Sequence, residues 1–409
     1  MKTYIALTLF TFTITQAQPP NKPQIQADLN GILTDIEDNY AYQKDKNIDL
    51  NCIKQKYSQK IDAINSEEQT VLFFEILLDE FYDSHVILNT NRNSSYRLYA
   101  PIYARLQDNK FIISSVWQSQ LETINQNIIG AEIVKFNGVD FEKTINDFPT
   151  ECQDKNRAEI KQWLANKVLA GRYNQARILS LKLRNKKTIE FDLDKLKIKH
   201  DEGLLTAKIV SNIGIIRINN SLGQNDLVRA FDKTLDGLFD TKALIIDLRN
   251  TVDGGDSYVA RGIMSRFVSE DKPYQKHWYV DTAAHNPDVV RTWVEYVSPR
   301  AKTYNKPVVV LVGRWTGSMG EGLAIGFEGI GRAQIVGTEM ERLAGEMNGF
   351  GFKHQKYGFR LSTAKLFHVN GTPREKYVPK HYVQQTQLNK DEYLGYSLQL
   401  LNKQPSKTH

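Results

Sequence analysis

Four continuous apolar runs in the second half of the chain most strongly constrain its fold. Their sequences are IGIIRI (213–218), ALIIDL (243–248), VVVLVG (308–313) and AQIVG (333–337). Strands covered by helices on both faces read as unbroken apolar runs, whereas strands with one wet face alternate apolar and polar residues. Between the runs lie segments whose apolar residues have helical spacing, for instance Val259, Ile263, Met264 and Phe267. The pattern therefore predicts an α/β domain over residues 203–400.

The region before this domain begins with helical periodicity. Apolar residues from Ile25 onward fall on one helical face, and Ser66 and Gln69 have capping-box spacing ahead of a second apolar stripe. We expect a helical domain at residues 18–92.

Short runs of β-forming residues follow, over residues 93–202. They read FIISSVW, AEIVKFNGV, ARILSLKL and TIEFDL, and Asn137-Gly138 is a strong tight-turn signal between apolar runs. This stretch is predicted to be a β-rich module.

Residues 269–306 show few apolar periodicities, so we interpret them as an insertion or a long loop that could lie over a site. The segment is rich in aromatic residues, which favours either a substrate-facing surface or ordinary packing. These residues are Tyr274, Trp278, Tyr279, Trp293 and Tyr296.

The first residues, MKTYIALTLFTFTITQAQPP, are typical of an export signal. A single basic residue precedes a short apolar core, and small residues stand at both ends of the tripeptide Thr15-Gln16-Ala17 before a cleavage position after residue 17. The alternative is a buried terminal strand or helix. The apolar run is too short to span a bilayer, and no cysteine follows the cleavage position to carry a lipid. We expect an exported, periplasmic or secreted protein with a signal peptide at 1–17 and a polar tail at 401–409.

Net charge, histidine spacing and cysteine count indicate which binding partners and metals the sequence excludes. The net charge is +6, without the clustered Lys/Arg block that tracks nucleic-acid phosphates. The eight histidines are scattered and no metal-binding spacing is present. We therefore expect no nucleic-acid partner, metal or cofactor. Cys52 and Cys152 are the two cysteines, and the sequence leaves their pairing open.

The stretch TGSMGE, which contains Ser318, follows the third apolar run. A strand that turns directly into a helix leaves free backbone N–H groups that favour negative charge. A serine there can attack a carbonyl while adjacent amides hold the oxyanion. It can equally be a turn or N-cap residue, and these residues alone leave both interpretations open.

A second loop, DLRNTVDGGDS, follows the second apolar run and contains Gly254 and Gly255. It is either a common glycine-rich turn or a ligand-binding loop. Its spacing fits neither common nucleotide-binding glycine motif.

Taken together, DLRNTVDGG and TGSMGE resemble the C-terminal processing and tricorn-type serine peptidases, over most of residues 204–380. The resemblance implies a crotonase/ClpP-like core with Ser318 as nucleophile. It also implies a PDZ-like domain, since IIGAEIVKFNGVDF (128–141) resembles part of one.

The general base distinguishes two branches of that family. The Ser/Lys branch places a lysine 25 residues after the serine, where this chain has Leu343. The tricorn-type branch looks as if it uses a tetrad of Ser, His, Ser and Glu instead. Its residues correspond here to Ser318, His85, Ser84 in Asp83-Ser84-His85, and Glu375 in GTPREKYVP.

The resemblance implies acyl-transfer roles for these residues. His85 would remove and later return the Ser318 proton, while Ser84 and Glu375 would orient the imidazole. The Met319 N–H, with that of Gly254 or Gly255, would form the oxyanion hole.

Neighbouring charged residues have supporting roles in this interpretation. Asp247 and Arg249 would brace the glycine loop, and Glu321 would pair locally.

Three functions remain open from the sequence. The first is an exported serine endopeptidase acting on peptides or unfolded and C-terminal protein segments. The second is an inactive relative that holds peptides by strand addition to its PDZ-like module. The third is an esterase that uses the same serine. Labelling of Ser318 would exclude the second, and comparing peptide with ester substrates would separate the other two.

Overall fold

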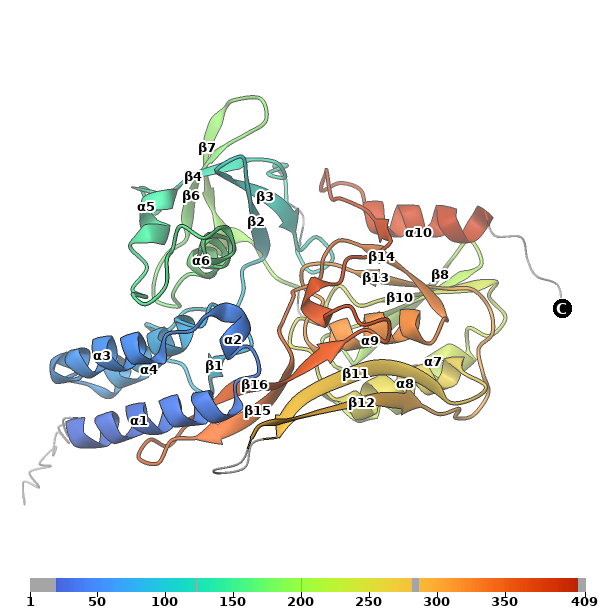
Figure 1. Cartoon of the computed structure of the whole chain (residues 1–409). Coiled ribbons are helices and arrows are strands. Elements are labelled where there is room, and N and C mark those ends of the chain that lie inside the picture. Colours follow the sequence, from blue (N-terminus) through green and yellow to red (C-terminus); the bar gives the residue numbers. More distant parts are fainter. Residues whose placement is uncertain (1–19, 123, 200, 282–286, 404–409) are drawn as a thin grey trace, which may run out of the picture.

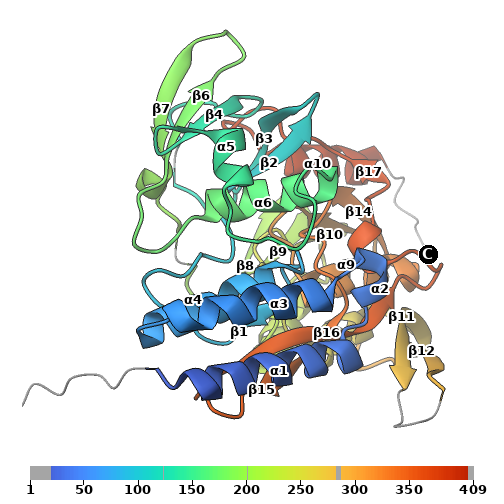
Figure 2. The ribbon, with the colours of Figure 1, turned by 60° about the vertical axis from the view of Figure 1, so that its left-hand side comes forward.

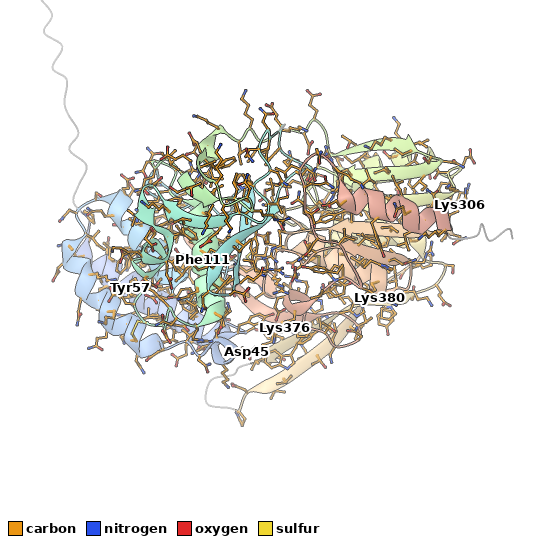
Figure 3. All side chains as sticks on the ribbon, turned by 90° about the horizontal axis from the view of Figure 1, so that it is seen from above. Asp45, Tyr57, Phe111, Lys306, Lys376 and Lys380 are labelled. Carbon is orange, nitrogen blue, oxygen red and sulfur yellow. A yellow bond between two sulfur atoms is a disulfide. The ribbon has the colours of Figure 1, made fainter. Side chains whose placement is uncertain are left out.

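The computed structural model describes residues 20–122, 124–199, 201–281 and 287–403, so the expected signal peptide lies outside the described residues. Figure 1 shows three parts: N-terminal helices in blue, a β-rich module above them, and a larger α/β part coloured yellow to red. In the view from above (Figure 3), the labelled Tyr57 of the helical part and Lys306 of the α/β part lie towards opposite ends. Lys376 is drawn between them.

The α/β part is built on a six-stranded sheet in the order β17-β14-β13-β10-β9-β8. All neighbours are parallel except β8 and β9. The four apolar runs are confirmed as strands β9, β10, β13 and β14. The strands are β8 (Leu205–Val210), β9 (Ile213–Ile218), β10 (Ala243–Asp247), β13 (Val308–Val312), β14 (Ala333–Gly337) and β17 (His381–Tyr382).

Helices cover both faces of this sheet, which explains the unbroken apolar runs. Alternate strand residues such as Leu244 and Ile246 pack with α7 (Asp226–Asp236), α8 (Ser257–Met264) and α9 (Met319–Gly329). The intervening residues, such as Ile245, pack against α10 (Glu392–Lys403). Because side chains alternate along a strand, every position of β10 and β13 is buried, and only Arg217 of β9 and Ala333 and Gln334 of β14 are partly exposed.

A second sheet has the strand order β1-β16-β11-β12, and β15 also pairs with β16. Two of its strands show that the interpretation of residues 269–306 was wrong. Residues 269–306 are not a long loop, because they form the antiparallel pair β11 (Lys272–Asp281) and β12 (Val289–Val297). Inward-facing polar residues, for example Gln275 and His277, hide the alternation that identifies strands. The other strands are β1 (Ile87–Leu88), β15 (Glu346–Gly351) and β16 (Gly358–Phe367).

The N-terminal helices pack against this second sheet. Helix α1 (Lys22–Asn39) lies along β15 and β16 in Figures 1 and 2. Helix α4 (Glu67–Asp79) begins as predicted, with the Ser66 hydroxyl accepting the Gln69 N–H. The sequence analysis did not identify α2 (Gln43–Lys46) and α3 (Leu50–Lys60), which bury few apolar residues.

The β-rich module is a sheet in the order β2-β3-β4-β6-β7, with β5 beside β4. Asn137 and Gly138 form the expected tight turn, with φ angles of 49° and 82°. The elements are β2 (Ile102–Gln107), β3 (Lys110–Val116), β4 (Glu132–Phe136), β5 (Val139–Asp140), β6 (Ile178–Lys182), β7 (Thr188–Asp192), α5 (Phe141–Asn146) and α6 (Ala158–Ala170).

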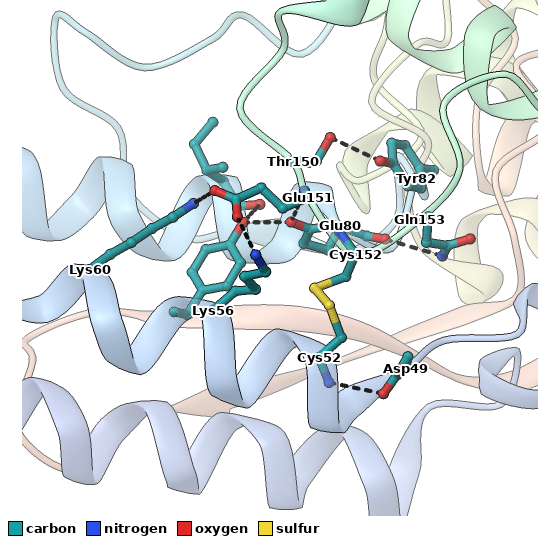
Figure 4. The surroundings of a disulfide bond; sticks show 12 residues. Asp49, Cys52, Lys56, Lys60, Glu80, Tyr82, Thr150, Glu151, Cys152 and Gln153 are labelled. Carbon is teal, nitrogen blue, oxygen red and sulfur yellow. Dashed lines mark hydrogen bonds and ion pairs between the residues drawn. A yellow bond between two sulfur atoms is a disulfide. The ribbon is translucent and has the colours of Figure 1, made fainter.

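A disulfide between Cys52 and Cys152 joins the helical part to this module (Figure 4). The two Cα atoms lie 5.8 Å apart, and 100 residues separate the cysteines in sequence. The buried Glu80 carboxylate holds the same loop, because it accepts the N–H groups of Glu151 and Cys152 at 2.7 and 3.1 Å. The bond thus closes a long loop between two parts of the chain.

Within the described residues, no helix combines the length and apolarity needed to cross a bilayer. No group of His, Cys, Asp and Glu side chains in that part of the chain is arranged to hold a metal ion.

We predict that the double substitution Cys52→Ser and Cys152→Ser lowers the free energy of unfolding by about 2–5 kcal/mol, because it frees a long loop in the unfolded chain. Thermal unfolding followed by circular dichroism, with and without dithiothreitol, measures the change. Reductant should lower the melting temperature of the wild type and leave the double variant unchanged. Equal melting temperatures of the two oxidised proteins would contradict the prediction.

Candidate active site

Two loops leave the same edge of the central sheet side by side. Strands β10 and β13 are parallel neighbours, so their carboxyl ends meet at that edge. The loops pair through a bridge between Thr251 and Thr316, and the Gly317 N–H donates to Thr251 O at 3.1 Å. The hydroxyls of both threonines donate to Leu248 O. The glycine loop and the serine turn are therefore one hydrogen-bonded unit.

Ser318 occupies an uncommon backbone conformation at the start of α9. Its φ and ψ are 47° and −111°, and Met319 is the first helical residue. Positive φ is rare for residues other than glycine and costs on the order of 1–3 kcal/mol. The serine thus stands where free amides begin a helix, held in a conformation that the surrounding contacts must maintain.

Gly254 lies directly against this turn. Its φ is +66°, and a Cβ there would lie 3.0 Å from Ser318 Oγ and 2.9 Å from Met319 N. Its own N–H already donates to Thr251 O at 3.0 Å. The amides of Gly255 and Met319 make no hydrogen bond to another described residue. The structure thus brings the three predicted oxyanion residues together, with two of their amides free.

Glu321 ties the serine turn to a later segment. Its side chain is fully buried and accepts the N–H groups of Ser318, Arg342 and Leu343 at 3.1, 2.9 and 3.1 Å. Burial raises the pKa of this carboxyl to about 7. The prediction that Glu321 pairs locally is confirmed, and the pairing also reaches residues 342–343.

The segment 342–345, which precedes β15 and is bonded to Glu321, also contacts His85. The Ala344 carbonyl accepts a hydrogen bond from His85 Nδ1 at 2.8 Å. Arg374 donates to the carbonyls of Leu343 and Gly345 at 3.0 and 2.7 Å. Strand β1, which follows His85 closely, is pinned by its pairing with β16.

The environment of His85 favours a neutral imidazole. The residue is 2% exposed, and burial together with the Arg374 guanidinium lowers its pKa to about 4. The carbonyl at Nδ1 requires the proton on that nitrogen, so Nε2 carries the free lone pair. Nε2 has no hydrogen-bond partner among the described residues, Ser318 Oγ included.

Asp83 is a buried carboxylate beside His85 to which the sequence analysis gave no role. It accepts the His85 backbone N–H at 2.9 Å and the Tyr40 hydroxyl at 2.6 Å, and lies 3.6 Å from Lys46 Nζ. Arg374, next to Glu375 in the chain, was missed in the same way. Their adjacency to predicted tetrad residues was the only signal in the sequence.

The other two predicted tetrad residues lie in different surroundings. The half-buried Glu375 sits on a short helical turn, η4 (Arg374–Lys376), and accepts the Tyr42 hydroxyl at 3.5 Å. Burial raises the pKa of Glu375. Ser84 is exposed, and its hydroxyl accepts the indole N–H of Trp163, in α6, at 3.1 Å.

Arg249 braces the glycine loop, which confirms that expectation. It donates to Asp247 at 2.9 and 2.7 Å and to Asp391 at 2.8 and 2.9 Å.

Ser318 opens onto a cavity of about 390 Å³ between the serine turn, the β11–β12 hairpin and the start of β15. No lysine is among the described residues that line it, and Leu343 is a buried apolar residue. His85 is not part of this lining. The lining residues are Asp253, Gly255, Asp256, Ser257, Gln275, His277, Glu295, Ser318, Met319, Gly345, Glu346, Met347, Asn348, Gly349, Arg360, Leu366 and Arg374.

Comparison with known proteins gives two domain matches. Residues 212–383 match peptidase family S41, and residues 23–83 match the tricorn protease C1 domain. The first match contains the serine turn, and the second ends two residues before His85. No curated protein sequence matches the chain.

Solved structures of proteases share the fold. Mature CPAF is 15% identical over 93% of this chain and 96% of its own, with a TM-score of 0.62. The photosystem II D1 C-terminal processing protease is 13% identical over 88% of this chain and 92% of its own, with a TM-score of 0.52.

We predict that Gly254→Ala lowers the rate of Ser318 chemistry by about 100-fold, because the added methyl displaces the serine turn. Gly331→Ala is the matched control: its φ is +71°, but no atom lies within 4 Å of its Cβ position. Gly331→Ala should lose stability only through its positive φ, whereas Gly254→Ala also loses stability through the clash with Ser318, and only Gly254→Ala should lose activity per folded molecule. Equal activity of the two variants would show that the contact does not shape the turn.

Proposed function

Because this chain is a serine peptidase whose residues 212–383 belong to peptidase family S41, we propose that it cleaves peptide bonds with Ser318 as nucleophile and His85 as general base. The observation that carries the proposal is the His85 ring. Its Nδ1 is held by Ala344 O, its Nε2 has no partner in the part of the chain that the structure describes, and the segment that holds it is bonded through Glu321 to the Ser318 turn.

The chemistry follows from these positions. Neutral His85 accepts the Ser318 proton as the hydroxyl attacks the substrate carbonyl, then delivers a proton to the leaving amine. The Ser318–His85 hydrogen bond forms in the substrate complex, as catalytic hydrogen bonds often tighten only there. Asp83 supplies negative charge beside the imidazolium that forms, and Ser84 and Glu375 remain predicted members of the tetrad.

We assign the oxyanion hole to the amides of Met319 and Gly255. Both are free of other described partners, whereas the Gly254 amide is used within its own loop. In this assignment, Gly254 supplies the space in which the serine turn fits.

We further propose that the β-rich module is a PDZ-like domain that does not bind peptides by strand addition to β2. Strand β2 is at the edge of its sheet, but its outward amides at Ala104 and Leu106 already donate to Asn166 and Gln162 of α6, at 2.9 and 2.7 Å. A peptide strand would have to displace both side chains. This occupied edge disfavours the interpretation of the chain as a peptide-binding relative.

We propose that the protein is exported to the periplasm or the extracellular space. The support is the N-terminal sequence pattern together with the Cys52–Cys152 disulfide, since disulfides persist in oxidising compartments.

Hydrolysis of reduced, unfolded casein tests the proposed mechanism. Ser318→Ala and His85→Gln should each lower the rate by more than about 10³-fold, as removal of a triad member does. His381→Gln, at a half-buried histidine whose Nδ1 lies 3.0 Å from the Tyr396 hydroxyl, is the control and should match the wild type. Full activity of His85→Gln would contradict the assignment of His85 as the general base.

Two additional arms refine the result. Activity that survives in Glu375→Gln or Ser84→Ala would remove that residue from the tetrad. Hydrolysis of short esters without peptide cleavage would identify an esterase.

The pH profile supplies a second prediction. A base must be unprotonated, and the pKa of His85 is lowered to about 4. His85 should therefore cause no loss of activity as the pH falls through about 6.5, the usual histidine pKa, and should be protonated only near pH 4. Glu321, whose pKa burial raises to about 7, also titrates in this window, so Glu321→Gln is measured beside the wild type. The measurement is kcat/KM against pH, with circular dichroism at each point to confirm that the protein is folded. Half-loss between pH 6 and 7 that persists in folded Glu321→Gln would contradict the account.

A further inference from the structure

The cavity at Ser318 extends to a group of hydrogen-bond acceptors outside the predicted tetrad. Gln275 and His277 come from β11, Glu295 comes from β12, and Glu346 begins β15. These four side chains, which we term the acceptor cluster, share the cavity lining with the nucleophile. A peptide bound at Ser318 would meet them with a neighbouring side chain.

His277 lies between the two carboxylates of the cluster. It is 4% exposed, with Nδ1 3.3 Å from Glu346 Oε2 and Nε2 3.6 Å from Glu295 Oε2. Its ring stacks on Trp293, with centroids 4.6 Å apart. The Arg261 guanidinium also lies 3.7 Å from Glu295 Oε1 and offsets that carboxylate, so the cluster keeps a negative charge, on Glu346, while His277 is neutral.

Gln275 adds an independent observation. It is 3% exposed and lines the cavity, and its Oε1 has no hydrogen-bond partner among the described residues. Leaving a buried acceptor unpaired is unfavourable. The amide Nε2 of the same side chain lies 3.2 Å from His277 Nε2, so Gln275 connects the cluster to α9 and leaves one acceptor unpaired among the described residues.

The charged side chains that line the cavity include more carboxylates than guanidiniums, which favours a cationic substrate side chain. Four carboxylates line the cavity, against two guanidiniums from Arg360 and Arg374. Arg374 directs its Nη2 to the carbonyls of Leu343 and Gly345. The four carboxylates belong to Asp253, Asp256, Glu295 and Glu346.

The spacing suits a long side chain. Gln275 Oε1 lies 3.2 Å from the Cβ position at Gly322, four residues after Ser318 in α9. One helical turn rises about 5.4 Å, so this oxygen lies roughly one turn along α9 from the nucleophile. Met319, Met347 and Leu366 line the same cavity and offer apolar contact for a methylene stem.

We propose that the acceptor cluster is the far end of the S1 subsite and selects lysine or arginine as the residue whose carbonyl is attacked. Glu346, whose side chain is 49% exposed and has His277 as its ion-pair partner, is the principal specificity residue. Glu295 and Gln275 accept further hydrogen bonds from the cation, and His277 positions the two carboxylates. This inference rests on the proposed peptidase function.

Cleavage of matched quenched peptides that differ only at the P1 residue tests the inference. The wild type should cleave after Lys or Arg at least about tenfold more efficiently than after Leu or Glu. Glu346→Gln should abolish most of this preference while leaving cleavage after Leu intact. Glu270→Gln is the control: Glu270 is exposed at the base of the hairpin, pairs with Lys272, and should not change the preference. A wild-type preference for apolar or acidic residues, or an unchanged preference in Glu346→Gln, would overturn the inference.

Binding of the amidinium probe p-aminobenzamidine separates failure of this inference from failure of the proposed function, because it needs no catalysis. The probe should bind the wild type and Ser318→Ala equally, and bind Glu346→Gln at least about tenfold more weakly. If no peptide is cleaved but the probe binds in this pattern, the cation subsite stands and the peptidase mechanism falls. Absence of binding to folded wild type would overturn the subsite.

Discussion

The buried carboxylate of Glu321 is the interaction on which the candidate site depends. It receives N–H groups from the serine turn and from residues 342 and 343, and with the Glu341 N–H, which donates to Thr316 O at 3.1 Å, it fixes two loops that no strand pairing joins. The same short segment presents Ala344 O to His85 and two carbonyls to Arg374. A buried group with three donors is stable only when all three are in place. The nucleophile and the base are therefore coupled through backbone, and their relative position depends on this carboxylate.

The central sheet explains why the serine can hold an unfavourable backbone. Strands β10 and β13 are buried on both faces and deliver two loops to one edge, where threonine hydroxyls and backbone bonds join them. That rigid unit maintains the positive φ of Ser318 and presses Gly254 against it. Strain at a functional residue persists only where its surroundings over-determine the conformation. The site thus uses the stability of the most buried part of the molecule.

Sequence reasoning reached the parts of this architecture that depend on local pattern. The four apolar runs, the Asn137-Gly138 turn and the serine and glycine loops all carry short-range signals. The contacts of His85 do not, because its partner is a backbone carbonyl 259 residues away. The β11–β12 hairpin escaped because its inward positions, such as Gln275 and His277, are polar. Arg374 acts on carbonyls of a distant segment, and side-chain identity alone cannot indicate such a contact.

The central claim is that His85 activates Ser318. Its most direct test is peptide-level mass spectrometry of the mature protein after brief exposure to a fluorophosphonate probe, with the rate of adduct formation followed in the wild type, Ser318→Ala and His85→Gln. The account predicts an adduct on Ser318 alone, absent from Ser318→Ala and formed far more slowly in His85→Gln. An adduct on another residue, or an undiminished rate in folded His85→Gln, would contradict it.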